Sequence, residues 1–438
     1  MKKILIAGTS SGAGKTTIST AIMGALEGVS PFKAGPDYID PKFHEFITKN
    51  PSNNLDLFIM GEESVKYIFS KNTKNISIVE GVMGLYDGLS HELDNYSSAH
   101  LSRVLDLPVI LVVNGKGAST SIAATVLGFK NLDPRVKIKG IILNNVGSER
   151  LYNLLKEGVE RYTKIPCVGY FPRDERVSID ERHLGLQQAS EIENLSEKIE
   201  ILKDMAKKYL DLDKILEIAE DGNDYKEIKN PTEYLKDRFK GKRVGIAKDK
   251  AFSFYYSENL KLMRYTGMDL IEFSPINDSH LPDNLDYIYL GGGYPEIFAK
   301  RLYENKSMIE EIKNASKKIP IYAECGGFMY LSKGIKQLND EFDPMCGLLD
   351  IKVEMRPRLN ISRFGYVDYE SEDGVKGRCH EFHYSDIYDV NEKDLYFELK
   401  KKNGKKWSCG YKKDKIIAGY PHIHFYGNLE IFVKLFDR

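Results

Sequence analysis

The stretch "KKILIAGTSSGAGKTTISTAIM", residues 2–23, decides the fold of the N-terminal half. It opens with a short apolar run, passes through a loop of glycine and serine, and continues into a segment with helical spacing. An apolar strand that turns through glycines into a helix is the first unit of a parallel α/β sheet. We therefore predict an α/β fold that begins with a doubly wound, mostly parallel sheet.

Further apolar runs support this prediction. Four of them, "ISIVEG", "PVILVVN", "KGIILNN" and "PCVGYFP", lie between Ile76 and Pro172. They are apolar on both faces, as strands buried between two helix layers must be. A second series follows from Lys242: "KRVGIAKD", "DLIEFSP", "LDYIYLGGG" and "IPIYAECGG". This second series predicts another α/β domain.

The segment between the two series has a different character. Residues 191–240 are dense in charge and helical in period, and "DGND" and "NP" interrupt them. A chain of 438 residues is also too long for one ordinary core. We predict a phosphate-loop domain at 1–190, a helical connector at 191–240 and a second domain at 241–438.

The overall composition limits the classes of partner that we expect. With 63 Lys+Arg against 64 Asp+Glu, nothing in the net charge favours nucleic acid or an anionic membrane. No apolar run approaches the roughly 18 to 20 residues that span a bilayer. The 5 cysteines lack CxxC spacing, which argues against a disulfide framework or zinc site. We expect a cytoplasmic protein with small-molecule substrates, and a homodimer stays open.

The loop "GTSSGAGKTT", Gly8–Thr17, has the features of a nucleotide site. Its glycines let backbone N–H groups surround phosphate oxygens, Lys15 supplies a cation, and Thr16 can ligate Mg²⁺. Gly8 lies six residues before Gly14, one more than in the commonest spacing. The alternative is a glycine-rich turn that binds no nucleotide. The predicted nucleotide-binding residues here are Gly8, Thr9, Gly12, Gly14, Lys15, Thr16 and Thr17.

Polar residues beside this loop are candidates for metal and substrate contacts. Glu80 ends a buried strand, where it could hold Mg²⁺ directly or through water. Lys33 could reach the transferred phosphoryl group. Asp37 and Asp40 could orient substrate or bind a second metal, or they could cap the loop beside two prolines. The substrate and phosphoryl candidates are Lys33, Asp37, Tyr38 and Asp40.

Other candidates have weaker support in the sequence. Asn144 ends a strand and is a candidate contact for the nucleotide base, although strand-end asparagines are also ordinary turn residues. Four basic residues could meet substrate carboxylates, with solvated charge as the alternative for each: Lys116, Arg173, Arg182 and His183.

The spacing of "GTSSGAGKTT" resembles the phosphate loop of dethiobiotin synthetases, which activate a carboxylate by phosphorylation. Three more segments resemble the cobyrinic acid a,c-diamide synthase family: "FKAGPDYIDPKFH" (32–44), "VEGVMGLYDG" (79–88) and "FPRDERVSIDERHLGL" (171–186). The resemblance covers nearly the whole chain. It implies that ATP and Mg²⁺ are the cofactors of the first domain.

In the second domain, "YAECGGF" has the layout of a nucleophile elbow. Cys325 follows a strand and precedes two glycines, which a tight strand-to-helix turn needs. The helix that follows predicts a lowered thiol pKa. A partner base is required. The candidate bases are His380, His383, His422 and His424.

These segments resemble a class I glutamine amidotransferase domain of the cobyrinic and cobyric acid synthase type. The resemblance implies Cys325 as nucleophile and His422 as base. Related triad enzymes have His-x-Glu here, whereas this chain has His422-Ile423-His424, so the acidic residue is missing locally. His424 remains a rival, because on a strand it would share a face with His422.

The loop "YLGGGYPE", residues 289–296, fits an oxyanion site, because successive glycines free backbone N–H groups to point at a developing negative charge. A plain glycine turn is the alternative. The predicted oxyanion donors are the amides of Gly292, Gly293 and Gly326.

Together the resemblances imply an ATP- and glutamine-dependent ligase that converts the a and c carboxylates of cobyrinate into amides in cobalamin biosynthesis. Its substrates would be cobyrinate, glutamine and ATP. Nickel-sirohydrochlorin and hydrogenobyrinate are alternative acceptors; a cobyric acid synthase fits "GPDYIDP" less well. The alternative of another class is a partner-regulated ATPase switch with an inert second domain.

Overall fold

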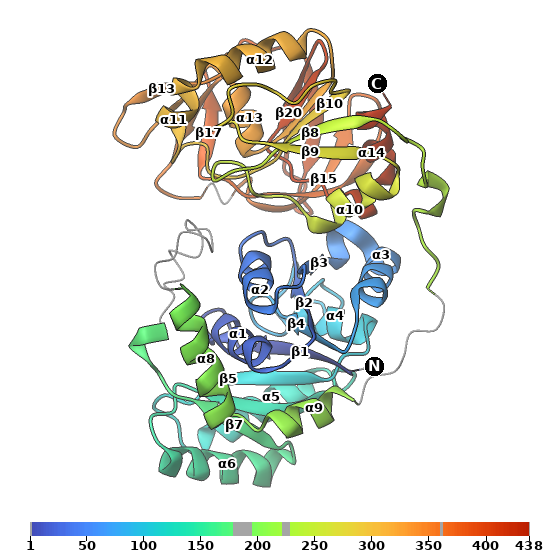
Figure 1. The fold of residues 1–438 in the computed structure, drawn as a ribbon. Helices are drawn as coiled ribbons and strands as arrows, with labels where there is room; N and C mark the ends of the chain where they lie inside the picture. The colour runs from blue at the N-terminus through green and yellow to red at the C-terminus, as the bar shows by residue number, and fades with distance from the viewer. Residues whose placement is uncertain (1, 178–194, 221–227, 360–361, 438) are drawn as a thin grey trace. The chain divides into compact units, whose positions relative to one another are not determined.

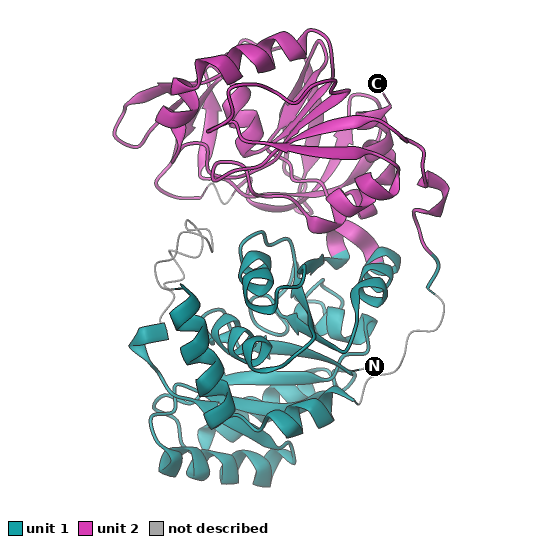
Figure 2. Cartoon of the chain, in the orientation of Figure 1, with its two compact units in different colours: residues 1–57, 62–229 teal, residues 58–61, 230–438 magenta. Residues whose placement is uncertain are grey.

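The computed structural model describes residues 2–177, 195–220, 228–359 and 362–437. It divides the chain into two compact units, coloured separately in Figure 2. Unit 1 comprises residues 1–57 and 62–229, and unit 2 comprises residues 58–61 and 230–438. In the described parts of the chain, no helix has the length and apolar character needed to span a membrane.

Unit 1 is built on a seven-stranded sheet in the order β3-β2-β4-β1-β5-β6-β7 (Figure 1). Every neighbouring pair in it is parallel, which confirms the predicted sheet. The strands are β1 Lys2–Gly8, β2 Val29–Ala34, β3 Asn53–Leu55, β4 Ile76–Glu80, β5 Val109–Asn114, β6 Ile138–Asn144 and β7 Cys167–Phe171. The helices are α1 Lys15–Ala25, α2 Asp40–Thr48, α3 Leu57–Asn72, α4 Ser98–Val104, α5 Ser121–Leu132, α6 Glu149–Thr163, α8 Leu195–Tyr209 and α9 Leu212–Ala219. Residues 58–61 of α3 belong to unit 2.

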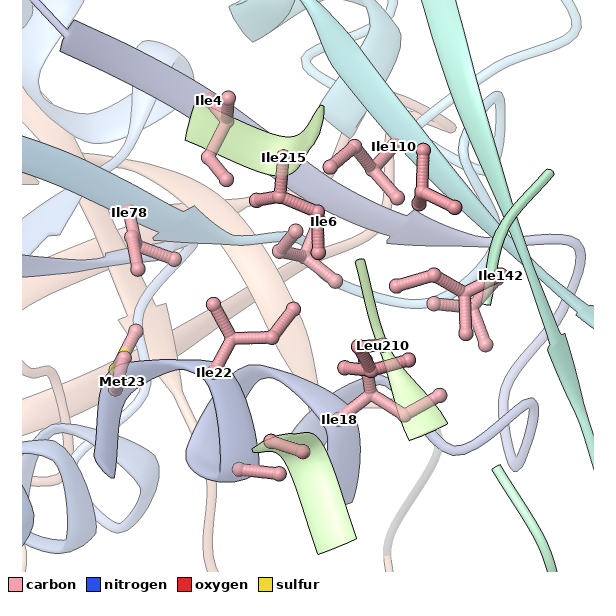
Figure 3. Packing of buried hydrophobic residues seen from close by; sticks show 14 of the residues in the cluster. Ile4, Ile6, Ile18, Ile22, Met23, Ile78, Ile110, Ile142, Leu210 and Ile215 are labelled. Carbon is pink, nitrogen blue, oxygen red and sulfur yellow. The ribbon is translucent and has the colours of Figure 1, made fainter. Parts of the chain in front are cut away.

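The opening stretch, residues 2–23, forms part of the apolar core of unit 1. Ile6 of β1 and Ile18 and Ile22 of α1 are fully buried in one apolar cluster. Leu210, the residue after α8, and Ile215 of α9 belong to the same cluster (Figure 3). These two helices lie in the stretch that we predicted as a connector, yet their apolar faces complete the first core. The last described element of unit 1 is therefore α9, and the functional division at 190 and 240 stays a prediction.

Unit 2 contains a nine-stranded mixed sheet in the order β16-β15-β18-β19-β20-β11-β10-β8-β9. Five neighbouring strands of this sheet are parallel: β20, β11, β10, β8 and β9. The other four extend the sheet with antiparallel pairs: β19, β18, β15 and β16. A smaller sheet has the order β13-β12-β14-β17. The sequence predicted the strands β8 to β11 but not the antiparallel extension.

The strands of unit 2 are β8 Arg243–Ala247, β9 Asp269–Phe273, β10 Tyr287–Leu290, β11 Ile321–Glu324, β12 Gly334–Lys336, β13 Phe342–Pro344, β14 Lys352–Met355, β15 Gly365–Ser371, β16 Lys376–Glu381, β17 Ser385–Tyr388, β18 Leu395–Lys400, β19 Lys406–Lys413 and β20 Ile416–Gly419. Its helices are α10 Ser257–Tyr265, α11 Ala299–Glu304, α12 Lys306–Ser316, α13 Gly326–Leu331 and α14 Leu429–Phe436. The candidate nucleophile lies between β11 and α13, at the carboxyl end of a parallel strand, where α/β sheets carry their sites.

Candidate functional site

The glycine-rich loop of unit 1 joins β1 to α1. Gly14, the residue before α1, has a φ of 96°, in the left-handed region. A Cβ added there would lie 2.1 Å from the Asn144 side-chain nitrogen, so any other residue would be both strained and crowded. The Lys15 ammonium donates a hydrogen bond to the Ser10 carbonyl 3.1 Å away, across the loop. A loop of this form before a helix N-terminus fits a phosphate group.

Asn144, at the end of β6, contacts the loop itself. Its side-chain amide donates to the Ala13 carbonyl at 2.8 Å, and the residue is nearly buried. The contact with Ala13 supports the backbone of the glycine-rich loop. That Asn144 also reaches a nucleotide base stays a prediction.

The carboxylate of Glu80 is the centre of a buried polar cluster at the end of β4. It is fully buried and accepts hydrogen bonds from four side chains: Thr16 (2.6 Å), Ser19 (2.6 Å), Lys33 (2.9 Å) and His44 (2.8 Å). Burial would raise the pKa of Glu80, but Lys33 and His44 hold it well below its ordinary range. An ionised carboxylate beside the Thr16 hydroxyl supplies the hard oxygen ligands that Mg²⁺ prefers, so these residues fit that ion.

Lys33 and the two aspartates occupy distinct positions beside Glu80. The Lys33 ammonium is buried and lies 2.5 Å from the Asp40 carboxylate. Burial alone would lower the pKa of Lys33, but Asp40 and Glu80 raise it, so the ammonium stays charged. The Asp37 carboxylate instead accepts from the backbone N–H groups of Ile39 and Asp40, at 2.7 and 3.0 Å. Asp37 thus has the loop-capping contact and Asp40 the ionic one, while Tyr38 between them is half-buried.

Sequence reasoning missed two residues of this cluster, Ser19 and His44. His44 is fully buried, and its second ring nitrogen lies 3.2 Å from the Ser52 hydroxyl. The sequence contains a signal for both residues, because His44 lies four residues after Asp40 and Ser19 lies three residues after Thr16. Residues at these spacings share a helix face.

Cys325 of unit 2 lies at a sharp turn between β11 and α13. Its backbone has a φ of 46° and a ψ of −100°, a strained conformation for a residue with a side chain. The following residue must be small, because a Cβ on Gly326 would lie 2.8 Å from the Gly293 nitrogen. The amides of Gly293 and Gly326 are therefore neighbours. This geometry is that of a nucleophile elbow beside backbone donors.

The Cys325 thiol does not have the lowered pKa that we predicted. Burial, with nearby Glu296 and Glu324, raises the pKa of Cys325, and the hydrogen bond from the Gly326 N–H does not offset this. The prediction of a ready thiolate is therefore wrong, and the thiol needs a base to accept its proton.

His422 lies against the same loop and can be that base. The Cys325 N–H donates to the Gly419 carbonyl at 2.7 Å, which joins the end of β11 to the segment that leads to His422. A Cβ on Gly292 would lie 2.6 Å from a ring carbon of His422. Burial, with His380 and His383 nearby, lowers the pKa of His422 to about 3, so the imidazole is neutral near pH 7.

The two C-terminal histidines contact different carboxylates. The Nδ1 atom of His422 lies 3.9 Å from the Glu324 carboxylate, and the Nε2 atom of His424 lies 3.6 Å from that of Glu258. The residues between β20 and the next helical turn do not form a strand. The condition on which we expected His422 and His424 to share a face, a regular strand, is therefore not met, although His422 forms an isolated β-bridge with His380.

Four basic residues complete the predicted set. Lys116 and Arg173 are exposed, as solvated charges are. Arg182 and His183 lie outside the described residues.

Glu381, the last residue of β16, gives a stability prediction. It is fully buried, and burial raises its pKa to about 7, above the ordinary 4.5. The folded chain therefore holds this proton more tightly than the unfolded chain, and the stability it contributes is lost as the pH rises from 4.5 through 7. Glu381→Gln has no such loss. At about pH 8 we expect the variant to unfold at a higher temperature, with a gain of about 3 kcal/mol.

Thermal unfolding of both proteins at about pH 8 and about pH 4.5 tests this expectation, since the difference should nearly vanish at the lower pH. Glu398→Gln, on β18 two strands away in the same sheet and half-exposed, is the control. An equal effect of Glu381→Gln at both pH values would contradict the assignment.

Comparison with known proteins gives two family matches. Residues 4–186 match a model described as the CobQ/CobB/MinD/ParA nucleotide binding domain, and residues 243–429 match a CobB/CobQ-like glutamine amidotransferase domain. The chain is 51% identical to a cobyrinate a,c-diamide synthase of Fusobacterium nucleatum subsp. nucleatum over 100% of both chains. It is 43% identical to one of Caldanaerobacter subterraneus subsp. tengcongensis, over 99% of this chain and 97% of the relative. A third, of Limosilactobacillus reuteri, is 44% identical over 100% and 99%.

Proposed function

The chain belongs to the cobyrinate a,c-diamide synthase family, and we propose that it converts the a and c carboxylates of cobyrinate into amides with ATP and glutamine. The observation that carries the proposal is the strained elbow at Cys325, beside glycine amides and a neutral imidazole. The same chain holds a phosphate loop and an ionised Glu80 beside Thr16. These are the parts that an ammonia-generating site and a carboxylate-activating site require.

In the first half-reaction, Cys325 attacks the side-chain amide of glutamine. The thiol proton passes to His422, the sulfur bonds to the amide carbon, and the imidazolium returns the proton to the leaving nitrogen. Ammonia departs, and water then releases glutamate from the thioester. The backbone N–H groups of Gly292, Gly293 and Gly326 stabilise the oxyanion that forms in each step.

In the second half-reaction, an acceptor carboxylate attacks the γ-phosphoryl group of ATP. The loop from Gly8 to Thr17 holds the phosphates, and Lys33 neutralises charge on the transferred group. Thr16 and Glu80 would hold Mg²⁺, which screens the phosphate oxygens. Phosphorylation turns a carboxylate oxygen into a leaving group, so ammonia can displace phosphate and form the amide. Asp37, Tyr38 and Asp40 are the residues proposed to orient the acceptor.

Cobyrinate is the acceptor that the names of the full-length relatives support. Nickel-sirohydrochlorin and hydrogenobyrinate present the same type of carboxylate, so they are the next acceptors to test. The same assay addresses a partner-regulated ATPase, because such a protein would hydrolyse ATP with no carboxylate acceptor present.

The experiment incubates the protein with Mg²⁺-ATP and cobyrinate, with either glutamine or ammonium as nitrogen donor. We expect amide formation from both donors, with one ATP consumed for each amide, measured by mass spectrometry of the product and by phosphate release. No amide on cobyrinate from either donor would contradict the acceptor. ATP hydrolysis that needs a protein partner and no carboxylate would contradict the reaction.

A further inference from the structure

We propose that Glu324, the residue before the nucleophile, is the carboxylate that orients His422. This inference rests on the proposed roles of Cys325 and His422 in releasing ammonia from glutamine. Related triad enzymes carry their acidic residue two positions after the histidine, where this chain has His424. In this chain the acidic residue comes from the strand of the nucleophile instead.

The carboxylate of Glu324 is buried and held by three donors. The Tyr322 hydroxyl and the Ile423 N–H donate to Oε1 at 2.6 and 3.2 Å, and the Tyr289 hydroxyl donates to Oε2 at 3.0 Å. Its side chain is 2% exposed, as is that of His422. Burial raises the pKa of Glu324 to about 7, and these donors oppose that rise because they favour the ionised form. A carboxylate fixed on three sides is suited to positioning a neighbour.

The Glu324 carboxylate lies beside the His422 ring. Oε2 lies 3.9 Å from His422 Nδ1, the nitrogen that an orienting acid contacts in a catalytic triad. The separation is longer than a hydrogen bond, as is common before substrate binds. The Ile423 N–H bond ties the carboxylate to the backbone next to His422, so the two groups are held together.

The positions of these residues along the chain also favour this arrangement. Glu324 ends β11 and Cys325 follows it, while the parallel pairing of β11 with β20 brings the segment after Gly419 alongside. Carboxylate and thiol thus follow one strand, and the base follows the strand paired with it. When His422 accepts the thiol proton, the carboxylate stabilises the imidazolium more strongly than it would in water, because the site is buried.

The chain supplies a matched control in Glu258. This carboxylate is fully buried and lies 3.6 Å from His424, the histidine two residues further along. Glu258→Gln changes a buried glutamate beside a buried histidine in the same way. The two changes differ in location, because neither Glu258 nor His424 lies at the elbow that carries Cys325.

The test measures glutamate release and amide formation by Glu324→Gln. We expect kcat for glutaminase to fall by about 10²- to 10³-fold, with KM for glutamine changed by less than about threefold. Amide formation from ammonium should continue. Glu324→Asp, which keeps the charge, should recover part of kcat, and Glu258→Gln should release glutamate at nearly the wild-type rate.

Two outcomes would overturn the inference: unchanged glutaminase kcat in Glu324→Gln, or equal losses in Glu324→Gln and Glu258→Gln. Thermal unfolding of each variant shows whether it is folded. If the glutamine variant is not folded, Glu324→Asp carries the test: its shorter side chain moves the carboxylate, so glutaminase kcat should fall in part while KM changes little, and a wild-type kcat would overturn the inference. Cys325→Ala separates this inference from the function it rests on. If Cys325→Ala loses glutaminase activity while Glu324→Gln keeps it, only the role of Glu324 fails; if Cys325→Ala keeps it, the proposed mechanism fails.

Discussion

Replacing Cys325 with alanine is expected to abolish glutamine-dependent amide formation, by at least about 10³-fold, while amide formation from ammonium continues. The reason is that only the sulfur can form the thioester from which ammonia is released. Added ammonium supplies the same nucleophile, ammonia, without the thioester. The measurement is amide product and glutamate formed by wild type and variant with each donor.

The control for this change is Cys346→Ala. Cys346 is buried to a similar degree but lies outside the elbow, so its loss should leave product formation from both donors nearly unchanged. Equal loss of product from glutamine and ammonium in Cys325→Ala would indicate that the variant is misfolded or that the two sites are not separable. Full glutaminase activity in Cys325→Ala would exclude this cysteine as the nucleophile.

The parts of this fold that the sequence predicted are those with a local signal. The parallel strands are short apolar runs, and their burial on both faces makes the pattern continuous. The elbow at Cys325 is likewise local, because the strand, the cysteine and the glycines adjoin one another. The strained backbone at Cys325 agrees with that pattern.

The parts that were not predicted depend on distant segments. The strands β15 and β18 mix buried residues with exposed or half-buried ones, so they contain no continuous apolar run that a search could find. Glu324 and His422 lie far apart in the chain and meet only because β11 pairs with β20. The helices α8 and α9 resemble a charged connector in sequence because they are rich in charged residues, yet Leu202 and Ile215 are fully buried.

Replacing Glu80 with glutamine is expected to reduce amide formation from both donors by about 10²- to 10⁴-fold, whereas glutamate release should persist. Glutamine is a neutral group of the same shape, so it removes the charge that Thr16, Lys33 and His44 contact. The Lys33 ammonium would then keep its ion pair with Asp40 but lose that with residue 80, and Mg²⁺ would lose its carboxylate ligand. The measurement is product from ammonium, which reports the carboxylate-activating site alone.

A second variant in the same buried cluster is the control for Glu80→Gln. Removing one partner of a buried ion pair can cost about 3 to 5 kcal/mol, so a loss of activity could reflect unfolding. Ser19→Ala removes one hydrogen bond to the same carboxylate and leaves its charge, so it should cost about 1 kcal/mol of stability and less than about tenfold in activity. Thermal unfolding and glutamate release show whether Glu80→Gln is folded. If that variant is folded and still forms amide from ammonium at the wild-type rate, Glu80 neither holds the metal nor supports phosphoryl transfer, and the cluster serves only to stabilise unit 1.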